Sequence, residues 1–214
     1  MHLIKKNLSN YKAWILDFDG TLYYQLPLRI CMALMILAYY IVHPWRISEI
    51  MLIQNYRQIR EELFAANEKN FHRQQLTRIA TKYELPVSAV EKLLHFWLFE
   101  KPLRLIKIFQ RKNLIKSIIQ HQKQGVQMIV YSDYPVNEKI AAVDFTPNHT
   151  FYSDDELIKC MKPNPAGLKN ILKSLNLKAD EVLYIGDRDD RDGLCAEAAG
   201  VEYLNIKDFS SRQQ

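Results

Sequence analysis

The sequence feature that most constrains the fold is an apolar run that ends directly in two carboxylates and a glycine. The stretch reads Ala13–Leu16 and then Asp17, Phe18, Asp19, Gly20 and Thr21. A short apolar run bounded by a turn signal is typical of a fully buried strand. Because side chains alternate along a strand, a regular strand would point Asp17 and Asp19 the same way, out of its carboxyl end. Gly20 then allows a sharp turn or a close approach to a ligand.

Two carboxylates held that close repel each other, so either one is protonated or a cation sits between them. Both states are chemically useful, because a metal-bound aspartate can act as a nucleophile and a protonated one as a general acid. A pair of solvated acids at a strand end explains this short stretch equally well. The later motifs therefore have to decide between these interpretations.

Glycine divides the chain into two kinds of sequence. Gly20 is followed by no glycine until Gly125, and the segment between them is rich in residues that favour helices. Its apolar spacing predicts four helices, near residues 49–64, 70–83, 88–98 and 105–124, with a capping box at Ser88 and Glu91 in the third.

After Gly125 strands and helices alternate. Strands are predicted at 126–131, near 151–152, at 182–185 and at 201–206, and helices at 165–175 and 193–199. This alternation is typical of a parallel sheet covered on both faces, to which the first strand also belongs. The prediction is an α/β core of residues 1–21 and 125–214, with residues 22–124 inserted as an all-helical cap.

Charge follows the same division. Residues 22–124 carry 16 Lys/Arg and 7 Asp/Glu, a balance of +9, and the rest carries 13 and 17, a balance of −4. The insertion contains no aspartate at all. We therefore expect one unit to concentrate carboxylates for a metal and the other to offer positive charge to an anion.

One stretch of the insertion, residues 30–42, has no charged side chain. At about 1.5 Å per residue it spans roughly 20 Å, short of the ~30 Å core of a bilayer. A helix that is apolar all round is either buried in protein or in lipid. We expect the central helix of the cap; the alternative is an interfacial membrane anchor, which the adjacent Trp45 and the flanking Arg29 and Arg46 favour.

Three further motifs follow predicted strands or open a helix. A strand at 126–131 leads to Ser132, which would face the same crevice as Asp17. Lys162 begins a Lys-Pro-Asn-Pro segment, and its two prolines hold the loop stiff before a helix. The strand at 182–185 leads to Gly186 and then to four acids within six residues, Asp187, Asp189, Asp190 and Asp192. Such a cluster suggests a cation, and hard oxygen ligands suit Mg²⁺.

Taken in order, these four stretches resemble the four motifs of the haloacid dehalogenase-like (HAD) superfamily. The resemblance covers about residues 11–21 and 125–206 and implies a Rossmann-like core with the site at the strand tips. The place of the helical insertion resembles the C1 cap of subfamily I. The last motif departs from the commoner spacing of the family, which is one residue shorter and would place Arg191 where an acid is expected.

The resemblance implies a Mg²⁺-dependent phosphatase that works through an aspartyl-phosphate. Asp17 would be the nucleophile and Asp19 the general acid and base, while Ser132 and Lys162 would hold the phosphoryl oxygens together with Gly20 and Thr21. Mg²⁺ would be held by the Asp17 side chain, the Asp19 backbone carbonyl, Asp187 and Asp192. Because family dehalogenases lack an acid at the position of Asp19, its presence favours a phosphoryl substrate. Asp189 and Asp190 would instead pair with Arg188 and Arg191.

Two alternatives remain open: a phosphotransferase or mutase of the same chemistry, and a non-catalytic protein that binds a membrane surface or a partner through the basic, apolar cap. The substrate would be a small phosphorylated compound, and the aromatic and basic cap suits a lipid or prenyl phosphate. No nucleic acid is expected, because no binding motif accompanies the positive charge. Three scattered cysteines and an N-terminal segment unlike a signal peptide predict a cytoplasmic protein, with membrane association as the open point.

Overall fold

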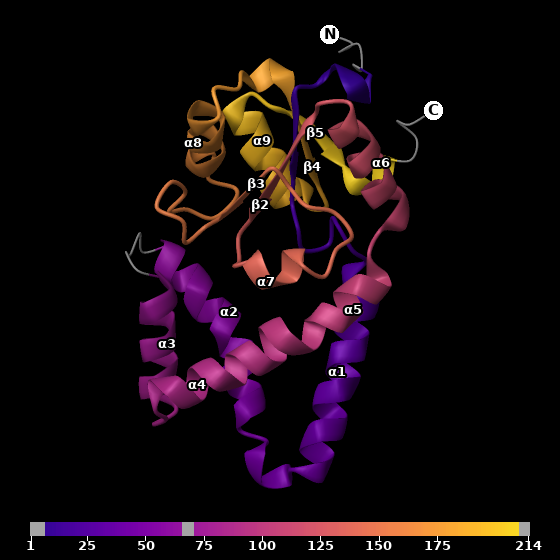
Figure 1. The fold of residues 1–214 in the computed structure, drawn as a ribbon. Coiled ribbons are helices and arrows are strands. Elements are labelled where there is room, and N and C mark those ends of the chain that lie inside the picture. Colours follow the sequence, from indigo (N-terminus) through magenta and orange to yellow (C-terminus); the bar gives the residue numbers. More distant parts are fainter. Residues whose placement is uncertain (1–6, 66–70, 210–214) are drawn as a thin grey trace. The chain divides into compact units, whose positions relative to one another are not determined.

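The computed structural model describes residues 7–65 and 71–209, so the N-terminal segment 1–12, predicted to be unlike a signal peptide, lies partly outside the described residues. It divides into two compact units, one made of residues 1–25 and 110–214 and the other of residues 26–109. Figure 1 shows the first unit as a sheet with helices and the second as helices alone. Each unit is described by itself.

The first unit is built on five parallel strands in the order β3-β2-β1-β4-β5. The strands are β1 (Ala13–Leu16), β2 (Gln127–Ser132), β3 (His149–Tyr152), β4 (Val182–Gly186) and β5 (Glu202–Asn205). β1 and β4 are buried throughout, as expected for parallel strands covered on both faces. The predicted α/β fold is confirmed, and each predicted strand is present.

Helices cover both faces of this sheet (Figure 1). The helices of the first unit are α6 (Lys112–Lys123), α7 (Asn137–Ile140), α8 (Ala166–Ser174) and α9 (Leu194–Ala199). Side chains of α8 and α9, among them Leu168 and Ala196, share one apolar cluster with Ile15 and Ile129 of the sheet. Trp14, which precedes Ile15 in β1, points to the other face, where its ring lies 4.4 Å from that of His121 in α6.

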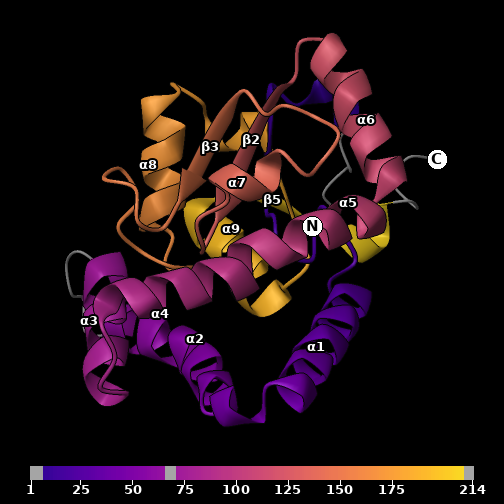
Figure 2. The ribbon, with the colours of Figure 1, turned by 60° about the horizontal axis from the view of Figure 1, so that its bottom comes forward.

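The second unit contains α1 (Gln25–Val42), α2 (Glu49–Ala65), α3 (Phe71–Lys82), α4 (Val87–Leu94) and α5 (Lys101–Phe109). A π-helical turn, η3 (His95–Glu100), joins α4 to α5, and a short 3-10 turn, η2 (Pro44–Arg46), joins α1 to α2. A core of Leu52, Ile59, Leu76, Ile79 and Val90 holds α2, α3 and α4 together. Figure 2 shows α1 and α2 as two arms that meet at η2.

The predicted helix over 105–124 is wrong as a single element, because the structure breaks it into α5 and α6. At the break, Gln110 forms a β-bridge with Tyr23, and the Arg111 amide donates to the Leu22 carbonyl at 2.8 Å. The two chain segments that connect the units are thus tied side by side. In the division into compact units, α6 belongs to the first unit and the second unit spans residues 26–109.

Two local predictions in the cap are also corrected. Helix α4 begins at Val87 after Pro86, so Ser88 lies inside the helix and no side-chain cap is formed. The uncharged stretch 30–42 does form a helix, but it is not a buried central helix, because only 17% of α1 is buried. Among the described residues α1 is the one helix long and apolar enough to cross a membrane, which is weak evidence by itself.

Candidate active site

Three neighbouring strands end at one edge of the sheet and deliver the first site residues. Leu16 of β1 lies opposite Val130 of β2 and Ile185 of β4. The pairing with β4 extends one residue further, since the Asp17 amide donates to the Ile185 carbonyl at 2.9 Å. The carboxyl ends of parallel strands meet at the same edge, so the residues that follow these strands come together there. They are Asp17 and Asp187, and Ser132, the last residue of β2, lies at the same edge.

Asp17 and Asp192 share one buried cation, the ammonium group of Lys162. Lys162 Nζ lies 2.6 Å from Asp17 Oδ1 and 2.7 Å from Asp192 Oδ1. Thr21 donates a hydrogen bond to the other oxygen of Asp17 at 3.1 Å. All four side chains are buried. Burial alone would lower the pKa of Lys162, but the charges of Asp17 and Asp192 outweigh it and raise that pKa, so Lys162 is charged at neutral pH.

Asp17, Asp187 and Asp192 form an acidic cluster in which one carboxylate oxygen of each lies within 4.8 Å of the others. Desolvation by burial raises the pKa of Asp17 and of Asp187, and the neighbouring carboxylates raise both further. Three carboxylates, two of them buried and that of Asp187 partly buried, face one ammonium group, which leaves excess negative charge. The donor set therefore fits a hard divalent cation.

Gly20 makes room for this cluster. Its φ is +98°, which favours glycine, and a Cβ atom at this position would lie 2.2 Å from Asp187 Oδ2. The backbone that follows Asp19 thus passes directly against the Asp187 carboxylate. Glycine is therefore required at position 20 for two reasons: the positive φ, and the close approach of the backbone to the Asp187 side chain.

Asp192 joins the cluster because the chain before it forms a wide turn. Residues Asp189–Gly193 form a single π-helical turn, in which the amides of Asp192 and Gly193 both donate to the Arg188 carbonyl. Such a turn accommodates an extra residue. This explains how the longer spacing of this motif still delivers an acid, while Arg191 instead contacts Asp133 at 3.5 Å.

The side chain of Asp19 is not part of the acidic cluster but has its own cation. Lys139 Nζ lies 3.1 Å from Asp19 Oδ1 and 3.2 Å from Oδ2, and the Tyr23 hydroxyl donates to Oδ1 at 2.6 Å. The two carboxylates of the first motif are thus each paired with a different lysine. Sequence reasoning missed Lys139 and Tyr23, since neither belongs to a motif.

The other predicted site residues lie as follows. Ser132 is buried, and its Oγ accepts a hydrogen bond from the Tyr134 amide at 3.2 Å. Its neighbour Asp133, which was not predicted as a site residue, accepts a hydrogen bond from the Lys162 amide at 2.9 Å. Asp133 therefore fixes the loop that carries Lys162. The signal for it was present, because it directly follows a strand end.

Two acids of the fourth motif lie outside the cluster on the surface. Asp190 pairs with Arg188 at 2.6 Å, as expected. Asp189 instead accepts a hydrogen bond from Asn205 at 2.7 Å, rather than pairing with an arginine. Both acids are exposed and provide matched controls for the buried ones.

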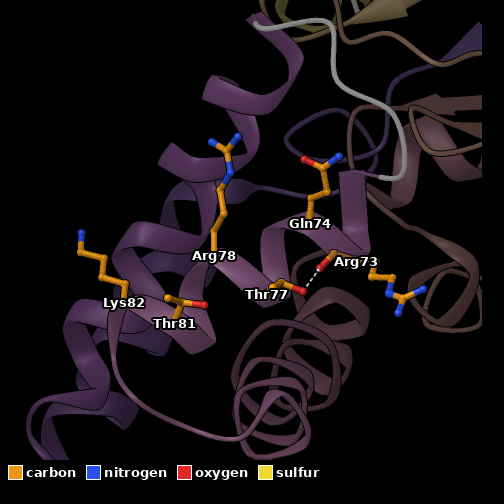
Figure 3. A pocket seen from close by; sticks show the side chains of 6 residues that line it. All are labelled: Arg73, Gln74, Thr77, Arg78, Thr81 and Lys82. Atoms are coloured by element: carbon orange, nitrogen blue, oxygen red, sulfur yellow. Dashed lines mark hydrogen bonds between the residues drawn. The ribbon is translucent and has the colours of Figure 1, made fainter.

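A surface hollow of about 520 Å³ lies in the second unit and is separate from the acidic cluster. Figure 3 shows its side chains projecting from one helix, α3. Its lining consists of Arg73, Gln74, Thr77, Arg78, Thr81 and Lys82. It contains three cations and no acid, so it contributes basic surface rather than metal ligands.

Comparison with known proteins identifies the family. The model of the haloacid dehalogenase-like hydrolases matches residues 11–200. The chain therefore belongs to the haloacid dehalogenase-like hydrolase family and is an enzyme of the hydrolase class. Comparison with curated sequences gave no match.

Solved structures share the fold at low sequence identity. The 2-haloacid dehalogenase of Pseudomonas syringae pv. Tomato DC3000 is 16% identical, with a TM-score of 0.59 over 90% of this chain and 85% of that one. A predicted phosphoglycolate phosphatase from Haemophilus somnus 129PT is 15% identical, with a TM-score of 0.55 over 97% and 100%. The HAD hydrolase YfnB of Bacillus subtilis, solved bound to magnesium, is 14% identical, with a TM-score of 0.58 over 91% and 87%. These likenesses establish the fold, and they include a dehalogenase and a predicted phosphatase.

Proposed function

We propose that this hydrolase is a Mg²⁺-dependent phosphatase that cleaves a phosphomonoester through an aspartyl-phosphate on Asp17. The observation that carries the proposal is the pairing of Asp19 with Lys139 and Tyr23, while Asp17 belongs to the acidic cluster. A second carboxylate, held apart from the metal ligands and in a fixed orientation, is what proton transfer to a leaving oxygen requires. Cleavage of a carbon–halogen bond releases halide and needs no such proton.

The reaction would proceed in two displacements at phosphorus. A carboxylate oxygen of Asp17 attacks phosphorus, the bond to the leaving oxygen breaks, and Asp19 gives that oxygen a proton. Asp19 then takes a proton from water, whose oxygen attacks phosphorus and breaks the bond to Asp17. The products are the alcohol and inorganic phosphate. Lys162 and Ser132 would hold the phosphoryl oxygens, with Gly20 and Thr21 lining the first turn.

The side chains of Asp17, Asp187 and Asp192 would hold Mg²⁺, together with the Asp19 backbone carbonyl. When bound, Mg²⁺ supplies positive charge that offsets the repulsion between the carboxylates and an anionic substrate. Three observations support this assignment. The three carboxylates lie close together, the single ammonium group of Lys162 does not balance their charge, and the backbone at Gly20 passes directly against Asp187.

The substrate class follows from the cap. We propose that residues 26–109 act as a C1-type cap and that its aromatic and basic side chains suit a small phosphorylated substrate with a bulky apolar group, such as a lipid or prenyl phosphate. Transfer of the phosphoryl group to a sugar hydroxyl, in place of water, is the alternative with the same chemistry. Dehalogenation is a second candidate, which the structural neighbours of that activity favour.

Phosphate release tests the proposal. The purified protein with Mg²⁺ would be given an aryl phosphate and a panel of sugar, nucleotide and lipid phosphates, and inorganic phosphate would be measured. We expect release that stops with chelator and in Asp17→Asn but continues in Asp190→Asn, which changes an exposed aspartate. Phosphate found on an added sugar instead of free in solution would indicate phosphotransfer. A folded protein inactive on every compound would support a non-catalytic role for the cap.

A further inference from the structure

Helix α1 is apolar on two opposite sides, and only one of them is buried. Leu28, Met32 and Tyr40 are buried. The other side presents a stripe of large apolar side chains at helical spacing, all at least half exposed: Leu26, Ile30, Leu34, Leu37 and Ile41. At about 1.5 Å per residue the stripe is roughly 22 Å long. A contiguous exposed apolar surface of this kind marks an interaction site.

The stripe continues onto the turn that follows α1. Trp45 is 74% exposed, and Ile47 and Met51 are also exposed. Figures 1 and 2 show η2, which carries Trp45, at the apex where α1 and α2 meet. We define the docking face as the five stripe residues of α1 together with Trp45 and Ile47.

Charge indicates what the docking face meets. Residues 22–124 carry 16 Lys/Arg and 7 Asp/Glu, a balance of +9. Between Gly20 and Ser48 the charged side chains are Arg29 near one end of α1 and Arg46 beyond the other, and Arg46 pairs with Glu49 at 2.7 Å. Two copies joined through these positively charged segments would repel each other. An anionic surface complements them, and exposed tryptophan beside cations is typical of the interface between membrane and water.

Packing favours a helix that lies along a surface over one that spans a bilayer. Leu28, Met32 and Tyr40, on one side of α1, are buried in protein. Its carboxyl end is tied down, since the Tyr40 hydroxyl donates to Glu49 at 3.0 Å and the rings of Tyr39 and Trp97 lie 5.3 Å apart. A helix with one side on protein and the other exposed can lie along a surface.

We propose that the docking face binds an anionic phospholipid bilayer, with α1 lying in the plane of the interface and Trp45 inserted beside it. This inference goes beyond the proposed function, because it concerns the cap alone and holds for any reaction at the acidic cluster. It assigns to α1 the role of a surface-binding helix, which composition alone could not distinguish from that of a core helix.

Vesicle binding tests the inference, with phosphatidylcholine vesicles prepared with and without phosphatidylglycerol. We expect the full chain to float with the anionic vesicles, less so at high salt. Leu34→Glu combined with Ile41→Glu should weaken this binding by about tenfold or more, because both charges would enter the apolar region. The matched control is Ile108→Glu, an equally exposed apolar residue of α5, which should bind like the wild type. Circular dichroism checks that all variants are folded.

Tryptophan emission gives an independent readout. Of the three tryptophans, Trp14 and Trp97 are buried and Trp45 is exposed. A blue shift on addition of anionic vesicles should therefore come from Trp45 and disappear in Trp45→Phe. A shift that persists in this variant would contradict insertion at η2.

Three other results would overturn the inference. One is equal binding by the wild type and the Leu34→Glu/Ile41→Glu variant. A second is loss of binding only in Arg73→Glu/Arg78→Glu, which would move the contact to the basic face of α3 (Figure 3). The third is a concentration-dependent dimer that the same double variant dissociates, without vesicle binding, which would make a second copy the occupant.

Discussion

Lys139 Nζ lies 3.1 Å and 3.2 Å from the two carboxylate oxygens of Asp19, across 120 positions of sequence. The ammonium group is almost fully buried, and the Tyr23 hydroxyl donates to the same carboxylate. This contact ties helix α7 to the turn that follows β1. It assigns to Lys139 the role of a positioning residue for the proposed general acid and base.

Lys139→Met should lower kcat by roughly a hundredfold, because a misdirected Asp19 transfers its proton poorly. The value of KM should change little, since Lys139 acts through Asp19 and not on the substrate. Lys159→Met is the control, because Lys159 pairs with Glu156 on the surface. A drop in kcat of the same size in both variants, or a lost fold in Lys139→Met, would remove the positioning role.

Mg²⁺ should raise the melting temperature of the protein, because a ligand that binds the folded state stabilises it. Asp187→Asn and Asp192→Asn should each weaken this shift, and Asp190→Asn should leave it unchanged. Differential scanning calorimetry with and without chelator measures the effect independently of any substrate. The metal assignment would fail if Asp190→Asn reduced the shift as much as Asp187→Asn and Asp192→Asn do.

Asp187→Asn should make the metal-free protein more stable near neutral pH. Burial raises the pKa of Asp187 above 3.8, so the folded state binds this proton more readily than the unfolded state does. Stability therefore falls as pH rises from the ordinary carboxyl pKa through the raised one. In chelator the advantage of the variant in melting temperature should be present at neutral pH and shrink as pH is lowered through that window. An advantage that grows on acidification would contradict the sign of the shift.

Lys162→Met should lower the free energy of unfolding by about 3 kcal/mol, because it leaves Asp17 and Asp192 buried without their cation. Adding Asp192→Asn should recover part of this loss. Urea denaturation in the presence of chelator measures both variants. Lys12→Met, which removes an exposed partner of Glu181, should lower the free energy of unfolding far less, because solvent screens this surface pair. Equal losses in Lys162→Met and Lys12→Met would mean that the buried ion pairs of Lys162 stabilise the fold no more than the surface pair of Lys12 does.

The strand-end residues of the site could be predicted from the sequence for a simple physical reason. Asp17, Ser132 and Asp187 each follow an apolar strand, and parallel strands deliver such residues to one edge of a sheet. Lys139 could not be predicted in this way. It comes from the four-residue helix α7, which is too short for a periodic pattern, and its partner Asp19 is far away in sequence.

The fold departs from the sequence prediction where tertiary contacts decide. The apolar spacing runs on from α5 into α6, so nothing local marks the break that Gln110 makes by bridging to Tyr23. Likewise, the apolar composition of α1 does not indicate whether its second side packs on protein or is exposed. The extra residue before Asp192 looked like a departure from the motif, and the wide turn over Asp189–Gly193 absorbs it.

The most direct test of the phosphatase proposal measures two products side by side. The protein with Mg²⁺ would be given an aryl phosphate in one reaction and a 2-haloacid in the other, and phosphate and halide would be followed in the wild type, Asp17→Asn and Asp190→Asn. The account predicts phosphate release that is lost in Asp17→Asn and kept in Asp190→Asn, with no halide released. Halide release that depends on Asp17, without phosphate release, would contradict it and make the protein a dehalogenase.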